Sequence, residues 1–181
     1  MYKTLFYFLF SINLILMNSC SSFLNNENLK PNYIMPQKID QNFEVTGRFF
    51  TQKNNKRFHG NFSWIKNKEM EEFNFLTPLG TTIATIQIIK NDQFLIYNNK
   101  RYGKDKIESL MINQLGFYLP LENLHYWIQG VNYPTTTQIK LVQNGFIQDN
   151  WLVEYLDFDK LHPKIINCSK KNYIIKIFIK W

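Results

Sequence analysis

The residue with the clearest chemistry is Cys20, which follows a nearly charge-free apolar run at the N-terminus. Lys3 precedes the run, and the first acidic residue of the chain is Glu27. One cation, a short apolar core and a small residue at its end are typical of a secretory signal peptide. Because Ser19 stands directly before Cys20, the pattern is that of a bacterial lipoprotein signal, in which the cysteine thiol receives a diacylglycerol. We therefore predict cleavage after Ser19 and lipidation of Cys20.

The same segment leaves one alternative open, an uncleaved N-terminal anchor with an incidental cysteine. The apolar run covers 5–17, which is shorter than the roughly 20 residues that a membrane-spanning helix needs. Asn18 departs from the small residue usual at its position in a lipoprotein signal. Ser21 follows the cysteine, where enterobacterial lipoproteins retained in the inner membrane tend to carry aspartate. The signal therefore favours a lipoprotein that is sorted to the outer membrane.

Residue patterns that carry catalysis are missing from the sequence. It contains no nucleophile elbow GxSxG, no phosphate-binding loop, no HExxH and no CxxC. His59, His125 and His162 are far apart and lack the spacing of metal ligands. The adjacent acids Glu71 and Glu72 would point to opposite faces of a strand. We expect a binding protein rather than an enzyme, with no cofactor and no metal.

The composition indicates an ordered domain with a basic surface. Hydrophobic residues make up 45% and aromatic residues 17% of the chain, which excludes a disordered mature protein. The net charge of +7 comes from lysines scattered between apolar segments, as on an ordinary solvated surface. Attraction to anionic lipid or to an acidic partner is the alternative, whereas nucleic acid is not expected. If Cys20 is lipidated, Cys168 has no partner for a disulfide and is expected to be buried.

The chain divides into three parts. Residues 1–19 form the predicted signal peptide, and 20–37 form a polar, proline-containing tether attached to lipid. A flexible chain of that length has a root-mean-square reach of about 23 Å. Residues 38–181 form one folded domain, which is long enough to bury a core.

Period-two alternation dominates this domain and predicts half-buried antiparallel strands. A segment with helical spacing interrupts them at 103–130, where Ile107 and Met111 lie on one apolar stripe and Gly116 ends it. A second short helix is predicted to begin near Pro120 and to end before Gly130. Two helices within a strand meander suggest a curved sheet with a covered mouth, or helices that simply fill a barrel end. The predicted strands are 43–49, 58–64, 70–77, 82–90, 93–98, 138–144, 150–157, 164–168 and 173–181.

Several stretches, in this order, resemble the outer-membrane lipoprotein receptor family LolB. They are "GRF" at 47–49, "GNFSW" at 60–64, "FLTPLGTTIATI" at 75–86, "LGFYLPLENLHYWIQG" at 115–130, "QNG" at 143–145, "WLVEYLDF" at 151–158 and the terminal "IKIFIKW". The resemblance implies a mostly β fold, a single open antiparallel β-barrel of about eleven strands with short helices covering an apolar cavity. It also implies a lipid-anchored protein that faces the periplasm from the outer membrane.

The resemblance implies a function as well. Such a receptor accepts acylated lipoproteins from a LolA-like periplasmic carrier and inserts them into outer-membrane lipid without nucleotide, and it is expected to be a monomer. Candidate residues lining the acyl cavity, which ordinary core packing would also explain, are Phe49, Phe62, Trp64, Phe75, Leu115, Leu121, Trp127 and Ile128. A generic lipid- or glycolipid-binding outer-membrane lipoprotein is the first alternative. A structural lipoprotein with a filled core is the second.

The tetrapeptide "TPLG" places an apolar residue in a turn, where it would normally be avoided. Leu79 stands between Pro78 and Gly80. An exposed leucine by itself needs no explanation. The matching loop of the resembling family protrudes and assists delivery into the membrane, so we assign Pro78, Leu79 and Gly80 to a membrane delivery loop.

Overall fold

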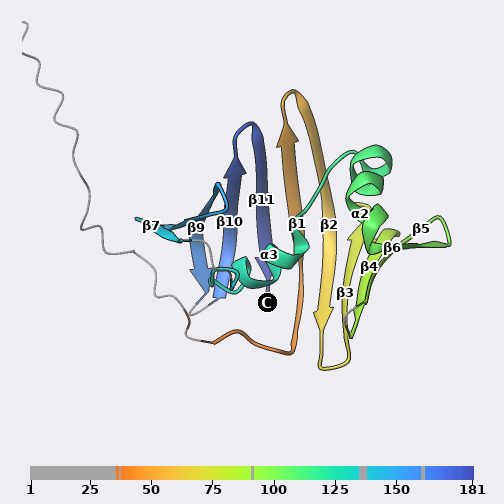
Figure 1. Cartoon of the computed structure of the whole chain (residues 1–181), viewed down its shortest axis with the longest axis horizontal. Coiled ribbons are helices and arrows are strands. Elements are labelled where there is room, and N and C mark those ends of the chain that lie inside the picture. Colours follow the sequence, from red (N-terminus) through yellow and green to blue (C-terminus); the bar gives the residue numbers. More distant parts are fainter. Residues whose placement is uncertain (1–35, 37, 91, 135–137, 160–161) are drawn as a thin grey trace, which may run out of the picture.

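The computed structural model describes residues 36, 38–90, 92–134, 138–159 and 162–181. These residues form one antiparallel sheet of eleven strands in the order β6-β5-β4-β3-β2-β1-β11-β10-β9-β8-β7 (Figure 1). Its edge strands β6 and β7 are not paired with each other, so the barrel is open, as predicted. The strands are β1 (Phe43–Lys53), β2 (Lys56–Lys66), β3 (Met70–Leu76), β4 (Thr82–Ile89), β5 (Asp92–Tyr97), β6 (Lys100–Gly103), β7 (Lys140–Val142), β8 (Gly145–Gln148), β9 (Trp151–Asp159), β10 (His162–Lys170) and β11 (Tyr173–Lys180).

The first and last strands pair at the centre of the sheet. β1 runs antiparallel to β11 from Thr46 opposite Lys180 to Lys53 opposite Tyr173. Both strands alternate buried and exposed residues, so each puts one face against the core and the other toward solvent. Every described strand and all of the described core lie within residues 43–181, so the segment 38–181, which the sequence predicts to be one domain, contains them all.

Glycines and bulges bend the sheet. A Cβ atom on Gly47 would lie 2.0 Å from the carbonyl oxygen of Phe178 and 2.8 Å from the ring of Phe62. The backbone of β1 can therefore approach β11 closely only because this side chain is missing. The pairing of β3 with β4 also shifts register between Phe75 and Leu76. Such irregularities increase local twist and give the sheet its curvature.

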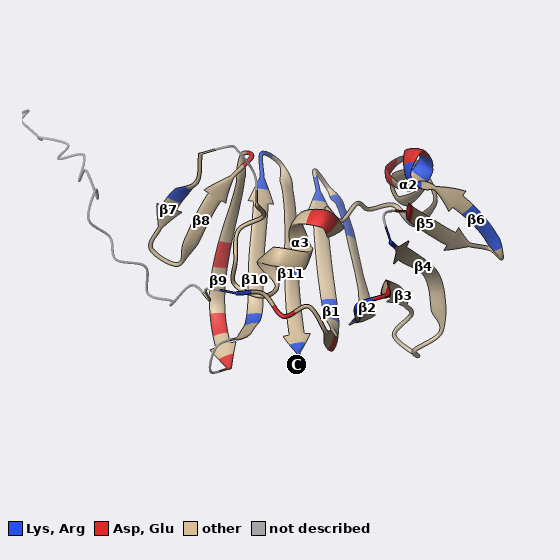
Figure 2. Ribbon diagram, turned by 60° about the horizontal axis from the view of Figure 1, so that its bottom comes forward, with Lys and Arg blue, Asp and Glu red and all other residues tan. Residues whose placement is uncertain are grey.

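The helical segment lies on one face of the sheet. It consists of α2 (Lys104–Leu110), the π-helix η1 (Met111–Leu115) and α3 (Leu121–Trp127). Gly116 ends η1 in the left-handed conformation with φ of 80°, as the sequence predicts. α3 lies across the middle of the sheet, and α2 lies over the side formed by β4 to β6 (Figures 1 and 2). No helix among the described residues is long and apolar enough to cross a membrane.

Two strands were missed by the sequence analysis. β6 covers the charged segment 100–103, and β8 covers 145–148, between the predicted strands 138–144 and 150–157; no strand is predicted at either place. β6 extends the sheet by pairing Tyr97 with Lys100 and Phe94 with Gly103. An edge strand of this kind is stabilised by main-chain hydrogen bonds to its one neighbour, so it needs no apolar alternation of its own.

Candidate functional site

The concave face of the sheet carries the aromatic residues that the sequence singled out. Of the eight predicted cavity residues, Leu115 is half-buried and the other seven are buried. They pack against one another and their neighbours, with the rings of Phe62 and Phe73 stacked 5.3 Å apart and those of Trp64 and Phe73 at 5.1 Å. Core packing and the lining of a closed cavity both produce such burial, so their role in binding stays a prediction.

Two small hollows border the α2–η1 segment. One, of about 210 Å³, lies beside Ile107, Met111 and Leu121. The other, of about 140 Å³, lies between η1 and the β1–β2 hairpin, against Phe58 and Phe117. Both fall below the roughly 300 Å³ at which ligand pockets usually begin. A third and wider hollow, of about 430 Å³, lies between α3 and the β3–β5 side of the sheet, and its lining is largely polar, with Lys66, Glu71 and Lys104 among its residues. The two hollows with apolar walls are thus too small for an acyl chain in this conformation.

Several of the residues around these hollows were not among the predicted cavity residues. Leu121 alone of the eight predicted residues lines either hollow. Ile107 and Met111 were placed on the apolar stripe of the first helix but were not assigned to the cavity. The sequence pattern does not indicate Phe117, because this residue follows Gly116, which ends the helix, and belongs to neither a helical nor a strand repeat. Its ring stacks on that of Phe58 at 4.3 Å, which only the folded chain shows.

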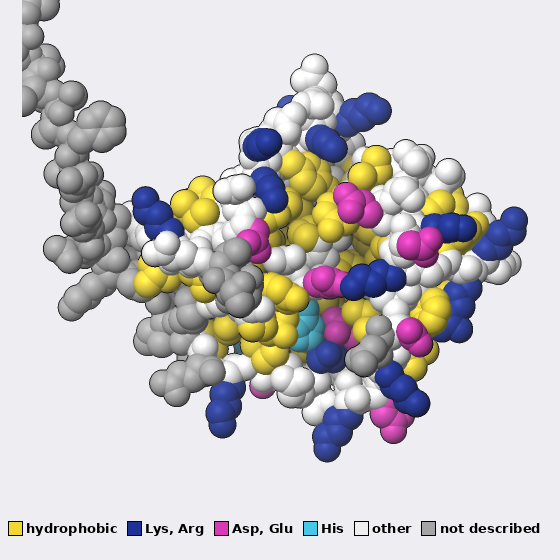
Figure 3. Space-filling view, viewed as in Figure 1, with side chains coloured by type: hydrophobic (Ala, Val, Ile, Leu, Met, Phe, Trp, Pro, Cys, Tyr) yellow, Lys and Arg dark blue, Asp and Glu magenta, His cyan; other side chains and the backbone are white. Residues whose placement is uncertain are grey.

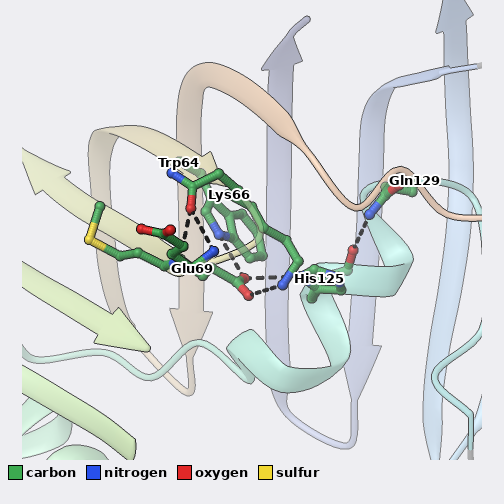
Figure 4. Close-up of polar contacts among 8 residues, drawn as sticks. Trp64, Lys66, Glu69, His125 and Gln129 are labelled. Atoms are coloured by element: carbon green, nitrogen blue, oxygen red, sulfur yellow. Dashed lines mark hydrogen bonds and ion pairs between the residues drawn. The ribbon is translucent and has the colours of Figure 1, made fainter. Parts of the chain in front are cut away.

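A buried acidic group fastens α3 to the sheet. Glu71 of β3 is only 8% exposed and accepts three hydrogen bonds. The three donors, Trp64, Lys66 and His125, are labelled in Figure 4. Oε1 of Glu71 accepts one hydrogen bond from the indole N–H of Trp64 at 2.9 Å and one from Nδ1 of His125 at 3.0 Å. Its Oε2 accepts one from Nζ of Lys66 at 2.9 Å. Because His125 belongs to α3, this carboxylate ties the helix to β2 and β3 together.

The charge of Glu71 is stabilised in the fold. Burial by itself acts to raise the pKa of this carboxyl, and it is the largest single influence. The hydrogen bonds and charges of His125 and Lys66 together outweigh burial, and the pKa lies below its ordinary value. Glu71 therefore stays ionised at neutral pH and holds its three donors as charge-assisted bonds.

The other end of α3 is tied to the opposite half of the sheet. The indole N–H of Trp127 donates to Oε1 of Gln148 on β8 at 3.2 Å. The hydroxyl of Tyr155 on β9 donates to the carbonyl oxygen of Trp127 at 3.1 Å. α3 thus connects β3 on one side with β8 and β9 on the other, as a strut across the concave face.

The α2–η1 segment is held differently. Among the described residues, the one polar side-chain contact between this segment and another element is the ion pair of Lys104 with Glu122, at 2.7 Å. Both side chains are exposed, and such surface pairs contribute little to stability. Ile107 and Met111 supply buried apolar contacts, which have no preferred direction. The cover therefore has a fixed part, α3, and a part held mainly by packing, α2–η1.

The loop between β3 and β4 displays Leu79 to solvent. Leu79 is 96% exposed, the highest value among the large exposed hydrophobic residues of the described chain. Gly80 takes φ of 86° and donates its N–H to the carbonyl of Thr77 at 2.9 Å. The amide of Asn61 donates to the same carbonyl at 3.3 Å and so fixes the base of the loop. The turn holds Leu79 outward, and its part in membrane delivery stays a prediction.

The remaining reactive groups form no site of their own. The described residues contain no group of three or more His, Cys, Asp or Glu side chains that could hold a metal ion. Cys168 is free and buried, as the sequence predicts, and burial raises the pKa of its thiol above the ordinary value. Cys20 and the predicted signal peptide lie outside the described residues, as does nearly all of the tether.

Comparison with known proteins decides the family. The family model "Outer membrane lipoprotein LolB" matches residues 41–181, which include the whole sheet. The chain belongs to the LolB family. LolB of Chromobacterium violaceum is 26% identical over 169 residues, with 92% of each chain covered. LolB of a Marinomonas species is 27% identical over 178 residues, with 91% of this chain and 90% of the relative covered.

Membership in the LolB family makes the chain an outer-membrane lipoprotein of a family that handles lipoprotein localisation. Among solved structures, the LolA superfamily protein NE2245 of Nitrosomonas europaea is similar at a TM-score of 0.47 and 10% identity. That match covers 80% of this chain and 86% of NE2245.

Proposed function

We propose that this LolB-family protein accepts acylated lipoproteins from a LolA-like periplasmic carrier and inserts them into the outer membrane. The observation that carries the proposal is a continuous apolar face under a cover of which one part, α2–η1, is held mainly by packing. The protein is anchored by lipid on Cys20, faces the periplasm, and carries its domain on the tether 20–37. Transfer uses no nucleotide and passes the acyl chains from one apolar surface to the next.

The energetics of acyl chains explain why a covered apolar face is needed. A triacylated lipoprotein carries three chains of about 15 methylenes, and each buried methylene contributes about 0.8 kcal/mol. Exposure of all three chains to water would thus cost up to roughly 36 kcal/mol. A carrier and a receptor must therefore exchange the chains directly, without releasing them into the aqueous space.

The two parts of the cover have different roles in this proposal. α3 stays in place, because Glu71, Gln148 and Tyr155 fasten it to both halves of the sheet. α2–η1 moves outward and widens the hollow beside Ile107, Met111 and Leu121 into a cavity for the acyl chains. Apolar side chains such as Met111 and Phe117 then lose contacts with neighbouring side chains and gain contacts with the acyl chains. Because one set of apolar contacts replaces another, the free energy of opening and binding together stays close to zero.

Delivery follows at the loop between β3 and β4. Leu79 enters the apolar part of the bilayer and holds the open cavity against it, so that the chains pass into lipid. A single leucine contributes about 2 kcal/mol on burial, which suits a reversible contact with the membrane.

A crosslink across the moving part tests the proposal. Lys56 and Ile112 are both exposed and line the same hollow, Lys56 from β2 and Ile112 from η1. We would join Lys56→Cys and Ile112→Cys with a short bifunctional maleimide, and Cys168, buried and protonated, will not compete. The crosslinked protein is expected to lose acceptance of cargo from the carrier in a purified system.

The same double variant before crosslinking is the matched control and should accept cargo normally. Mass spectrometry of the accepted material identifies it as acylated protein rather than free phospholipid or glycolipid. Normal acceptance by the crosslinked protein would refute the moving cover, and transfer of free lipid alone would refute the receptor function.

A further inference from the structure

The hollow between η1 and the β1–β2 hairpin, which we name the hairpin pocket, combines apolar walls with a basic rim. Its walls include Phe58, Phe117 and Ile112, and its rim includes Lys53 and Lys56. Ile112 is 41% exposed although it is a large apolar residue. Figure 3 shows dark-blue side chains gathered above an apolar hollow on this end of the molecule.

The two rim lysines occupy an unfavourable arrangement. Lys53 and Lys56 are directly opposite each other on the last rung of the β1–β2 ladder. Like charges in such a cross-strand pair destabilise the hairpin. Within the part of the chain that the structure describes, neither lysine forms an ion pair. Glu108 of α2 also lines the pocket, but it is not within ion-pair distance of either lysine. An anion bound at the rim would relieve this repulsion.

The neighbouring hairpin adds a further cation to the same end. The N–H of Asn54 donates to the carbonyl oxygen of Asn172 at 3.3 Å and so joins the tips of the β1–β2 and β10–β11 hairpins. Lys171 lies in the second tip and is exposed. Figure 2 shows basic residues at both tips. The basic rim therefore spans two hairpins that are fixed to each other.

The delivery loop points toward the same end of the sheet. β2 begins at the hairpin tip and β3 ends at Leu76, which pairs with Asn61 of β2. The loop that carries Leu79 thus follows β3 toward the end at which Lys53 and Lys56 lie. Leu76 lies level with Asn61, which is five residues, or about 17 Å, along β2 from Lys56, so a membrane that receives Leu79 approaches from the side of the basic rim.

From this arrangement we propose that the hairpin pocket binds an anionic phospholipid of the target bilayer. The phosphate lies between Lys53 and Lys56, and the glycerol and the adjacent methylenes contact Phe58 and Ile112. A diacylglyceryl group on a lipoprotein cysteine has no charge, so the basic rim selects bilayer phospholipid over cargo. The inference rests on the proposed function only in taking the lipid from the bilayer that the protein serves.

Binding to vesicles, without carrier or cargo, tests the inference. The segment 38–181 is sedimented with vesicles of phosphatidylcholine containing 30% phosphatidylglycerol, and with vesicles of phosphatidylcholine alone. The variant Lys53→Gln/Lys56→Gln should bind the anionic vesicles about 30-fold more weakly, since each lysine near an anionic surface contributes about 1 kcal/mol. The control Lys100→Gln/Lys140→Gln removes the same charge from exposed sites on the two edge strands and should change binding less than threefold.

Two further arms separate a lipid site from a simple anion site. Ile112→Ser keeps both lysines and should weaken binding of dihexanoyl phosphatidylglycerol severalfold, with unchanged circular dichroism. Glycerol 1-phosphate, which has no acyl chain, should compete poorly. The inference would be overturned if the two double lysine variants lost the same amount of affinity for anionic vesicles, or if the protein bound both vesicle types equally. Full competition by glycerol 1-phosphate would overturn it as well. A wild type that binds the anionic vesicles as expected but fails to transfer cargo would instead refute the proposed receptor function alone.

Discussion

Removal of the Glu71 carboxylate is the perturbation whose cost follows most directly from the structure. The variant Glu71→Ala leaves the indole N–H of Trp64, His125 and the ammonium group of Lys66 without their shared acceptor. Removing one partner of a buried ion pair costs about 3–5 kcal/mol. Because the side chain of Lys66 is 20% exposed and can turn toward water, we expect the lower end, about 3 kcal/mol.

The cost should depend on pH in a definite direction. The pKa of Glu71 is lower in the fold than its ordinary value of 4.5, so the folded state favours the ionised form. Its stabilisation is complete above the pKa of the unfolded chain and is lost as the pH falls through the lower pKa of the folded chain. The difference between wild type and Glu71→Ala should therefore be largest near pH 7 and should shrink well below pH 4.

Urea unfolding of 38–181, followed by tryptophan fluorescence, measures both effects. In a thermal melt, a decrease of about 3 kcal/mol in the free energy of unfolding would lower the melting temperature of a domain of this size by roughly 10 °C. The control Glu69→Ala lies in the exposed turn two residues earlier and should change the free energy of unfolding by less than about 0.5 kcal/mol. A Glu71→Ala loss no larger than that of the control, or the same loss at pH 7 and pH 3.5, would refute the proposed role of this carboxylate.

Three further substitutions test other parts of the structure. Leu79→Glu should still accept cargo but fail to release it into liposomes, whereas Leu79→Met should transfer normally; efficient transfer by the glutamate variant would remove Leu79 from the mechanism. Gln148→Leu leaves the N–H groups of Trp127 and Tyr133 without an acceptor and should cost about 3 kcal/mol in urea unfolding, against less than 0.5 kcal/mol for the exposed Gln138→Leu. Gly47→Ala places a methyl group 2.0 Å from a carbonyl oxygen of β11 and should cost about 3 kcal/mol, and a neutral result would show that β1 and β11 can separate there.

The sequence was most informative where local pattern and burial coincide. Alternation located both long central strands, because each has one face in the core and one in solvent. Helical spacing and Gly116 located the cover, since these are local requirements of a helix and its end. The exposure of Leu79 also followed from its turn, where Gly80 adopts positive φ.

Local pattern was insufficient where a residue depends on a distant neighbour. β6 is a charged segment that becomes a strand only because β5 offers it a ladder. Phe117 joins the aromatic cluster because η1 ends at Gly116 and turns the chain back toward Phe58. The role of His125 depends on Glu71, which is 54 positions away in the chain, so the sequence spacing could not indicate this pair.

The sequence alone thus determined most of the elements, the family resemblance and the candidate delivery loop, because each depends on residues close together in the chain. Only the tertiary structure decided which helix of the cover is fastened and which is held by packing. That distinction depends on hydrogen bonds between β3 and α3 and between α3 and β8, segments that meet only after the sheet has curved. Directional bonds resist displacement of a helix more than apolar contacts do, and in the proposed mechanism α2–η1 is therefore the part of the cover that moves.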